Sequence, residues 1–284
     1  MLETWPSWYI LIAAAGLGLI IGSFLNVLSL RLPRQLVTLQ QAEPPSSAST
    51  RKRWFGLDYL IWPPSQCWCC QQALRPWHMI PIISWVWLRA RCAHCAARIS
   101  VRYPVMEVGT ALATICVVLQ FGSGLTALYA SCLVWGLITL SAIDSVEYIL
   151  PDQLTLPLLW LGLIANLTGT FVPLTDAVWG AISGYVSLWF VFHIFHLITG
   201  KEGLGYGDFK LYAALGAWLG WELLPQILLF ASLTGALVGA GLIMVGKRDR
   251  QAPLPFGPFL ASAGGIALFY GAEINQWYLG MMGL

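Results

Sequence analysis

The chain alternates between long apolar stretches and short polar ones. A bilayer core takes about 20 apolar residues per helix, and about eight stretches have a suitable length and composition. They cover residues 8–30, 104–121, 125–143, 154–173, 177–199, 209–221, 224–246 and 256–276. The sixth is short and contains glycine. This pattern predicts an all-α polytopic membrane protein with about eight transmembrane helices.

Composition strengthens this interpretation. Of the 284 residues, 58% are apolar and only 10% are charged, whereas about a quarter of an ordinary soluble domain is charged. Arg31 and Arg34 follow the first apolar stretch, and no basic residue precedes it. A secretory signal peptide has the reverse polarity, so we expect residues 1–30 to form a retained transmembrane helix.

The basic residues predict the orientation of the chain. Ten of the fifteen lie between Arg31 and Arg102. The other five are Lys201, Lys210, Lys247, Arg248 and Arg250. All fifteen fall on one side of the membrane if the eight spans alternate, and short cytoplasmic loops are the ones that collect Lys and Arg. We therefore expect the segment 31–103 in the cytoplasm and both termini on the outer side. The lipid bilayer is the expected surrounding, and no nucleic-acid partner is expected.

The cytoplasmic loop, residues 31–103, begins with a Pro/Ser-rich, basic part that is typical of a flexible segment. Its second part contains two C-x2-C pairs, Cys67 with Cys70 and Cys92 with Cys95, separated by 21 residues. This spacing is close to that of a four-cysteine zinc ribbon. A reducing compartment disfavours disulfides, and a thioredoxin-like role would need one such pair. Zn²⁺ bound by the four paired cysteines is the prediction; unligated thiols, or a contribution from Cys69 or His94, are the alternatives.

Two acidic stretches adjoin the membrane-spanning segments. Asp144 ends the third span, where an ionisable group is costly unless it faces a cavity or a partner, so it is a functional candidate. Asp152 follows a turn proline and is most simply a helix N-cap. Glu147 suits a solvated loop. Glu107 lies one turn inside the second span, after Arg102, and could pair with it.

The second acidic stretch is "GLGYGDFKL", residues 203–211. Gly203, Gly205 and Gly207 remove side chains beside Asp208, so an extended peptide or a second backbone could approach closely. The alternative for Asp208 is that it caps the sixth span. No strand precedes the glycines, which argues against a dinucleotide-binding loop.

The expected topology brings Asp144 and Asp208 to the cytoplasmic face together. Two carboxyl groups in one semi-buried site do not both ionise easily, so one can hold a proton while the other deprotonates water. The favoured hypothesis is an intramembrane aspartyl protease. One alternative is a proton- or cation-coupled transporter that uses the same aspartates. Another is a scaffold that recruits partners through its zinc loop.

Six stretches give the chain a resemblance to a known family. They are "GSFLNVLSLRLPR" at 22–34, the paired C-x2-C motifs, "RYPVMEVGTAL" at 102–112, "IDSVEYILPDQLTLPLLWLGLIAN" at 143–166, "GKEGLGYGDFKL" at 200–211 and "PFGPFLA" at 255–261. With these the chain resembles, nearly end to end, the bacterial type IV prepilin peptidases, which are GxGD aspartyl proteases.

The resemblance implies a seven-helix peptidase core at 104–284 in the bacterial inner membrane, with Asp144 and Asp208 as the catalytic pair on the cytoplasmic side. It implies cleavage of a short basic leader from prepilins and type II secretion pseudopilins, then N-methylation of the new terminus, commonly phenylalanine, with S-adenosylmethionine. It also associates the tetracysteine loop with zinc. Glu107 and Asn26 are weak candidates for the methyl-donor site, and helix packing explains Gly22 to Asn26 equally well.

Overall fold

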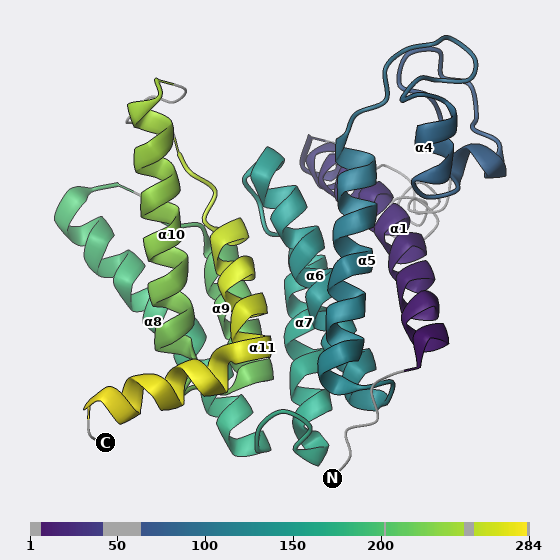
Figure 1. Cartoon of the computed structure of the whole chain (residues 1–284). Coiled ribbons are helices and arrows are strands. Elements are labelled where there is room, and N and C mark those ends of the chain that lie inside the picture. The colour runs from purple at the N-terminus through teal and green to yellow at the C-terminus, as the bar shows by residue number, and fades with distance from the viewer. Residues whose placement is uncertain (1–6, 42–63, 202, 247–252, 283–284) are drawn as a thin grey trace, which may run out of the picture. The chain divides into compact units, whose positions relative to one another are not determined.

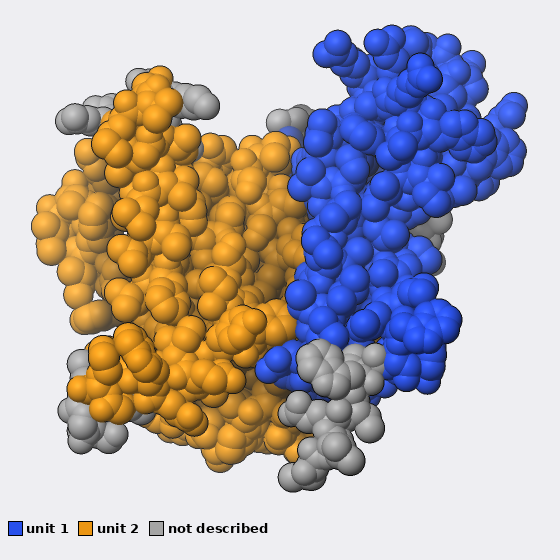
Figure 2. All heavy atoms as spheres, viewed as in Figure 1, with its two compact units in different colours: residues 1–127 blue, residues 128–284 orange. Residues whose placement is uncertain are grey.

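The computed structural model describes residues 7–41, 64–201, 203–246 and 253–282. The Pro/Ser-rich part of the loop, the basic residues Lys247, Arg248 and Arg250, and both chain ends lie outside the described residues. The chain divides into two compact units, residues 1–127 and 128–284, which Figure 2 colours separately.

The structure is helical in both units (Figure 1). Unit 1 contains α1 (Trp8–Gln41), a 3-10 turn at Pro76–Met79, α4 (Ile83–Trp87) and α5 (Arg102–Phe121). From α6 (Leu125–Glu147), which crosses the boundary, unit 2 continues with α7 (Asp152–Ala165), a 3-10 turn at Asn166–Thr168, α8 (Leu174–Thr199), α9 (Tyr206–Leu219), α10 (Leu224–Met244) and α11 (Gly257–Met282).

Each of the eight expected spans contains a helix. Five of these helices are long and apolar enough to cross a membrane: α1, α5, α6, α8 and α10. The chain is therefore a multi-pass membrane protein. Helices α7 and α9 have only 14 residues each, which is fewer than a bilayer core takes.

The first helix continues past residue 30 as far as Gln41. Arg31 and Arg34 end the apolar run. Arginine, leucine and glutamine are all good helix formers, so the helix itself continues beyond its apolar part.

Helices α1 and α5 pack backbone against backbone. A Cβ atom on Gly18 would lie 2.6 Å from Cα of Ala111, and one on Gly22 would lie 2.8 Å from Cα of Glu107. Gly18 meets Ala111, and four residues later on α1 Gly22 meets Glu107, which is four residues earlier on α5. The two helices therefore run antiparallel. Small residues four positions apart permit this close contact.

The contact between α1 and α5 ends in polar interactions. Asn26 is buried, and its Nδ2 donates to the carbonyl oxygens of Tyr103 (3.1 Å) and Gly22 (3.3 Å). One turn further along α1, the Ser29 hydroxyl accepts a hydrogen bond from Arg102 (3.1 Å). The stretch Gly22 to Asn26 thus has a packing role, as one of its two interpretations required.

Helix α9 forms the core of unit 2. From Asp208 onward all its residues except Lys210 are buried, and α7, α8, α10 and α11 all contact it. Gly216 of α9 meets Gly180 of α8 so closely that a Cβ atom on either would overlap the other's backbone. This packing buries the helix that carries Asp208.

Asn166 explains why α7 stops short of the expected residue 173. Its side chain is fully buried, and Nδ2 donates to the carbonyls of Ala217 (2.9 Å) and Trp218 (3.1 Å) at the end of α9. Its Oδ1 accepts from the N–H groups of Phe171 (3.0 Å) and Val172 (3.2 Å). One side chain therefore satisfies four backbone groups where the chain turns.

Candidate active site and metal centre

Asp144 lies in the last turn of α6 and is only 6% exposed. Its Oδ2 accepts a hydrogen bond of 2.9 Å from the N–H of Gly257, the first residue of α11. A Cβ atom at position 257 would lie 2.7 Å from the same oxygen. A residue without a side chain therefore lets the start of α11 come this close to the carboxylate. Sequence reasoning had assigned Gly257 no role.

Asp208 is likewise 6% exposed and is the third residue of α9. The N-cap of this helix is Gly205, so the alternative that Asp208 itself is the N-cap is wrong. Its Oδ2 accepts from the Gly205 N–H (3.0 Å), and its own N–H donates to the Gly205 carbonyl (3.1 Å). The side chain thus satisfies a backbone donor at the helix start, as the acidic residue of a capping box does.

The two carboxyl groups lie in the same region of unit 2. Leu150 connects their surroundings. A Cβ atom on Gly207 would lie 2.6 Å from Leu150 Cβ, and one on Gly257 would lie 3.2 Å from Leu150 Cδ2. The turn between α6 and α7 therefore contacts both Gly207, which precedes Asp208, and Gly257, whose N–H donates to Asp144.

The three glycines before Asp208 differ in their surroundings. A Cβ atom on Gly203 would lie 2.8 Å from the Phe195 ring, and Gly207 lies against the backbone and side chain of Leu150. At Gly205 a Cβ atom would meet the Asp208 carboxylate at 3.4 Å, which is an ordinary contact. Two of the glycines thus have close neighbours within this chain.

Asp152 is the first residue of α7, and the N-cap is Pro151, so the N-cap interpretation of Asp152 is wrong by one position. Its Oδ1 pairs with Nζ of Lys210 at 2.6 Å. The ring of Pro151 fixes the φ angle at the start of the helix, but proline offers no side-chain oxygen to cap it. The carboxylate of Asp152, one position later, pairs with Lys210 instead. Glu147 is exposed as expected, but it is the last residue of α6 and not part of a loop.

Aromatic rings gather beside Asp208. The ring centroids of Phe192 and Tyr206 are 5.3 Å apart, those of Phe192 and Phe209 5.7 Å, and those of Tyr206 and Phe209 5.5 Å. Phe192 and Phe209 are buried, whereas Tyr206 is exposed. Tyr206 therefore presents an accessible aromatic surface two residues from the carboxylate.

In unit 1, the sulfur atoms of Cys67, Cys70, Cys92 and Cys95 all lie within 4.8 Å of one another. Sγ of Cys67 and Sγ of Cys95 are 3.7 Å apart. Two sulfurs that are each about 2.3 Å from a tetrahedral zinc ion lie about 3.8 Å apart, so the arrangement fits zinc. Cys69 is exposed and is not part of this cluster.

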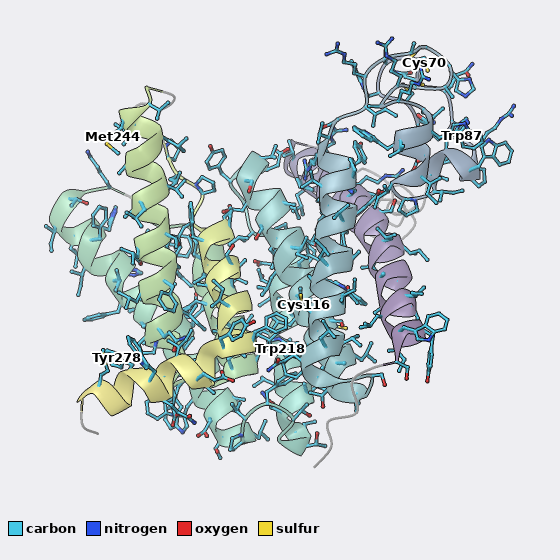
Figure 3. All side chains as sticks on the ribbon, in the orientation of Figure 1. Cys70, Trp87, Cys116, Trp218, Met244 and Tyr278 are labelled. Carbon is cyan, nitrogen blue, oxygen red and sulfur yellow. The ribbon has the colours of Figure 1, made fainter. Side chains whose placement is uncertain are left out.

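The two halves of the cluster have the same local structure. Antiparallel bridges join Gln66 to Ala73 and Arg91 to Arg98, one around each C-x2-C pair. In each half the residue after the second cysteine has a positive φ angle: Gln71 at 55° and Ala96 at 56°. Figure 3 shows Cys70 at one end of this cysteine module, residues 64–101.

The thiols respond unequally to their surroundings. N–H groups of Cys70 and Cys69 donate to Cys67 and lower the pKa of its thiol to about 6. The Ala97 N–H acts to lower the pKa of Cys95, but burial and the three neighbouring thiols outweigh it and raise that pKa to about 12. Four thiolates this close would repel one another, and a bound divalent cation would relieve that repulsion.

Asn26 and Glu107 are packed inside unit 1. Glu107 is buried and accepts a hydrogen bond of 2.8 Å from the Ile82 N–H. Arg102, its expected partner, donates to Ser29. Oδ1 of Asn26 is enclosed and has no hydrogen-bond partner among the described residues. Both side chains are thus enclosed within unit 1 and bonded to backbone groups, Asn26 to those of α1 and α5 and Glu107 to the residue before α4.

The fold and sites define a polytopic helical membrane protein in which two buried carboxyl groups each accept a backbone N–H. It also contains a four-cysteine cluster that could hold a metal ion. Residues 17–121 match the Bacterial Peptidase A24 N-terminal domain, and residues 131–240 match the Type IV leader peptidase family. The chain belongs to the type IV leader peptidase family.

Three similar proteins are each named prepilin leader peptidase/N-methyltransferase. The one from Aeromonas salmonicida strain A449 is 50% identical, over 92% of this chain and 91% of its own length. The one from Pseudomonas putida is 47% identical over 98% and 96%, and the one from Pseudomonas aeruginosa is 46% identical over 94% and 92%. No solved structure gives a significant match.

Proposed function

We propose that this chain removes the leader from type IV prepilins and type II secretion pseudopilins and methylates the new N-terminus, with Asp144 and Asp208 as the catalytic pair of its peptidase activity. Membership of the family and the names of the similar proteins support the activity. The observation that carries the residue assignment is the pair of buried carboxyl groups in one region of unit 2.

Hydrolysis by this pair needs one proton between the two carboxyl groups. The ionised carboxylate takes a proton from water as the water oxygen attacks the scissile carbonyl carbon, and the protonated carboxyl donates a hydrogen bond to the carbonyl oxygen. The C–N bond then breaks, and the leaving amine receives the proton that the base had removed. The Gly257 and Gly205 N–H groups keep each carboxyl in place throughout.

The surroundings suit the expected substrate. The aromatic surface at Tyr206 would receive an apolar side chain next to the cleaved bond, such as the phenylalanine that commonly follows the leader in this family. Ring–ring contacts of this kind contribute about 0.5–1.5 kcal/mol beyond the area that they bury.

The proposed topology has eight spans, with the five candidate helices joined by α7, α9 and α11. Protein covers α9 on several sides, so it needs less apolar length of its own than a helix that faces lipid. The first transmembrane helix, the cytoplasmic loop with its zinc site and the peptidase core then follow in order. The distribution of the basic residues supports a topology with the loop and the aspartates in the cytoplasm and both termini in the periplasm.

S-adenosylmethionine is the proposed methyl donor, since it would supply the methyl group to the neutral amine released by cleavage. We assign no residue to its site. Zn²⁺ bound to the four cysteines would join the two halves of the cysteine module, which is too small to bury much core of its own.

The test is incubation of the purified protein in lipid with a prepilin and S-adenosylmethionine, followed by mass spectrometry of the pilin N-terminus. We expect a shortened product with one added methyl group. Asp144→Asn and Asp208→Asn should each lower cleavage at least about 100-fold, and both should still methylate a pilin that has already been cleaved. Glu147→Gln, on the same helix end, is the matched control. Full cleavage by either Asn variant would refute the assignment.

The position of the aspartates argues against the alternative function, a proton- or cation-coupled transporter. Both carboxyl groups lie at helix ends, Asp144 in the last turn of α6 and Asp208 in the first turn of α9, whereas transporter sites lie near the middle of the membrane. Proton-coupled uptake into proteoliposomes without prepilin cleavage would favour it.

A further inference from the structure

The cysteine module contains an apolar segment that its metal site does not explain. Residues 79–88 read "MIPIISWVWL", with a single polar side chain among the ten. The segment includes α4. Ile83, Val86 and Trp87 are spaced as i, i+3 and i+4, so they share one face of this helix. They are 61%, 61% and 74% exposed.

The position of α4 along α5 shows where this face lies. The N–H of Ile82, just before α4, donates to Oε2 of Glu107. Glu107 comes five residues after Arg102, where the span begins, which corresponds to about 7.5 Å along the helix axis. Glutamate side chains lean back toward the helix start, so α4 begins beside the first turns of α5, at the level of the membrane boundary.

The surface of α5 beside the module is also apolar. Val101, Val105 and Val108 are all exposed, and the last two belong to a helix that is apolar enough to cross a membrane. Figure 3 shows Cys70 at the far end of the module from α1 and α5, and Trp87 nearer to the level at which α5 begins. The exposed face of α4 therefore borders surface that lipid is expected to cover.

The charge of the module complements an anionic surface. Residues 64–101 contain four arginines and no aspartate or glutamate. Arg89 and Arg91 follow α4 directly, and both are exposed. Tryptophan and tyrosine are enriched at membrane–water interfaces, and basic residues near the surface of the cytoplasmic leaflet are attracted to its anionic lipids.

We propose that α4 is an interfacial helix that inserts Ile83, Val86 and Trp87 into the cytoplasmic leaflet, with Arg89 and Arg91 on anionic phospholipid headgroups. The cysteine module is then held flat against the membrane instead of projecting into the cytoplasm. A basic prepilin leader is a poor occupant for this face, because the arginines would repel it.

The test uses the full-length protein in nanodiscs that contain phosphatidylglycerol and phosphatidylcholine. A photoreactive benzoylphenylalanine replaces Trp87, and in matched samples it replaces Trp68 of the first cysteine pair or Leu112, which is exposed on α5. After irradiation, lipid adducts are counted by mass spectrometry. A zinc content equal to that of the parent shows that the module is folded.

We expect at least about tenfold more lipid adduct at position 87 than at position 68, with position 112 as the positive control. Adding Arg89→Gln and Arg91→Gln should lower the preference of position 87 for phosphatidylglycerol, by up to about fivefold for each arginine. Equal lipid adducts at positions 87 and 68, adducts to a second copy of the chain in place of lipid, or no adduct at position 87 would each overturn the proposal.

Discussion

Replacement of Gly257 by alanine tests the proposed role of Asp144 without touching the aspartate. The new methyl carbon would lie 2.7 Å from Oδ2 and 3.1 Å from Cγ of Asp144, and 3.2 Å from Leu150 Cδ2. Ordinary van der Waals contact begins at 3.4 Å. Either the carboxylate or the start of α11 must therefore move by roughly 0.7 Å, on a scale where about 1 Å can cost a factor of about 100 in rate.

We expect Gly257→Ala to lower kcat for leader cleavage by roughly 10- to 100-fold and to leave KM little changed, because the aromatic surface near Tyr206 is untouched. The assay is cleavage of a prepilin by the purified protein in lipid, followed by the mass of the product. Methylation of a pilin that has already been cleaved serves as the internal control for folding, since that step does not require water to be activated by Asp144.

The matched variant is Gly265→Ala, in the same helix, where a new Cβ atom would meet nothing within 4 Å. Alanine is preferred over glycine inside a helix by about 1 kcal/mol, so this variant should cleave normally and melt no earlier than the parent. Cleavage by Gly257→Ala at the parental rate, or an equal loss in Gly265→Ala, would refute the reasoning.

Three further predictions concern other contacts. Cys67→Ser should abolish zinc binding, measured by metal analysis, whereas Cys69→Ser should retain one metal per chain. Asn166→Ala should lower the melting temperature in detergent, because four backbone groups lose a buried partner at about 1–3 kcal/mol each when no water replaces it; an unchanged Tm would contradict this. Lys210→Ala should change stability by less than about 1 kcal/mol, since its partner Asp152 is half exposed, and a large loss would show that the pair is structural.

Much of the fold follows from the lengths of the apolar runs. Eight runs predicted eight helices, and all eight are present. The helix ends were less predictable. Polar residues such as Arg31 mark where a membrane-embedded stretch can end, but a helix continues through them, as α1 does. The end of α7 depends on Asn166, whose partners at the end of α9 lie some fifty residues further along the chain.

In the candidate sites, too, local features were predictable from the sequence and long-range contacts were not. Cysteine spacing alone brought four sulfurs into one predicted site, because each pair forms a local turn and only the pairing of the two turns is long-range. The expected start of the sixth span was three residues too late: α9 begins at Tyr206, and its N-cap is Gly205 instead of Asp208. The sequence did not distinguish between them, since any glycine or aspartate near the helix start could be the N-cap. The contact between Asp144 and Gly257 spans 113 residues, and the motif "PFGPFLA" carried no sign of its partner.

The anchoring of Asp144 has a practical consequence for anyone who shortens this chain. The region that matches the Type IV leader peptidase family ends at residue 240, whereas the backbone donor to Asp144 lies beyond it at Gly257. A fragment trimmed to the matched boundaries would keep both acidic side chains and lose the tether on one of them. Such a fragment could insert into a bilayer normally and still be a crippled protease, and its inactivity would say nothing against the two acids.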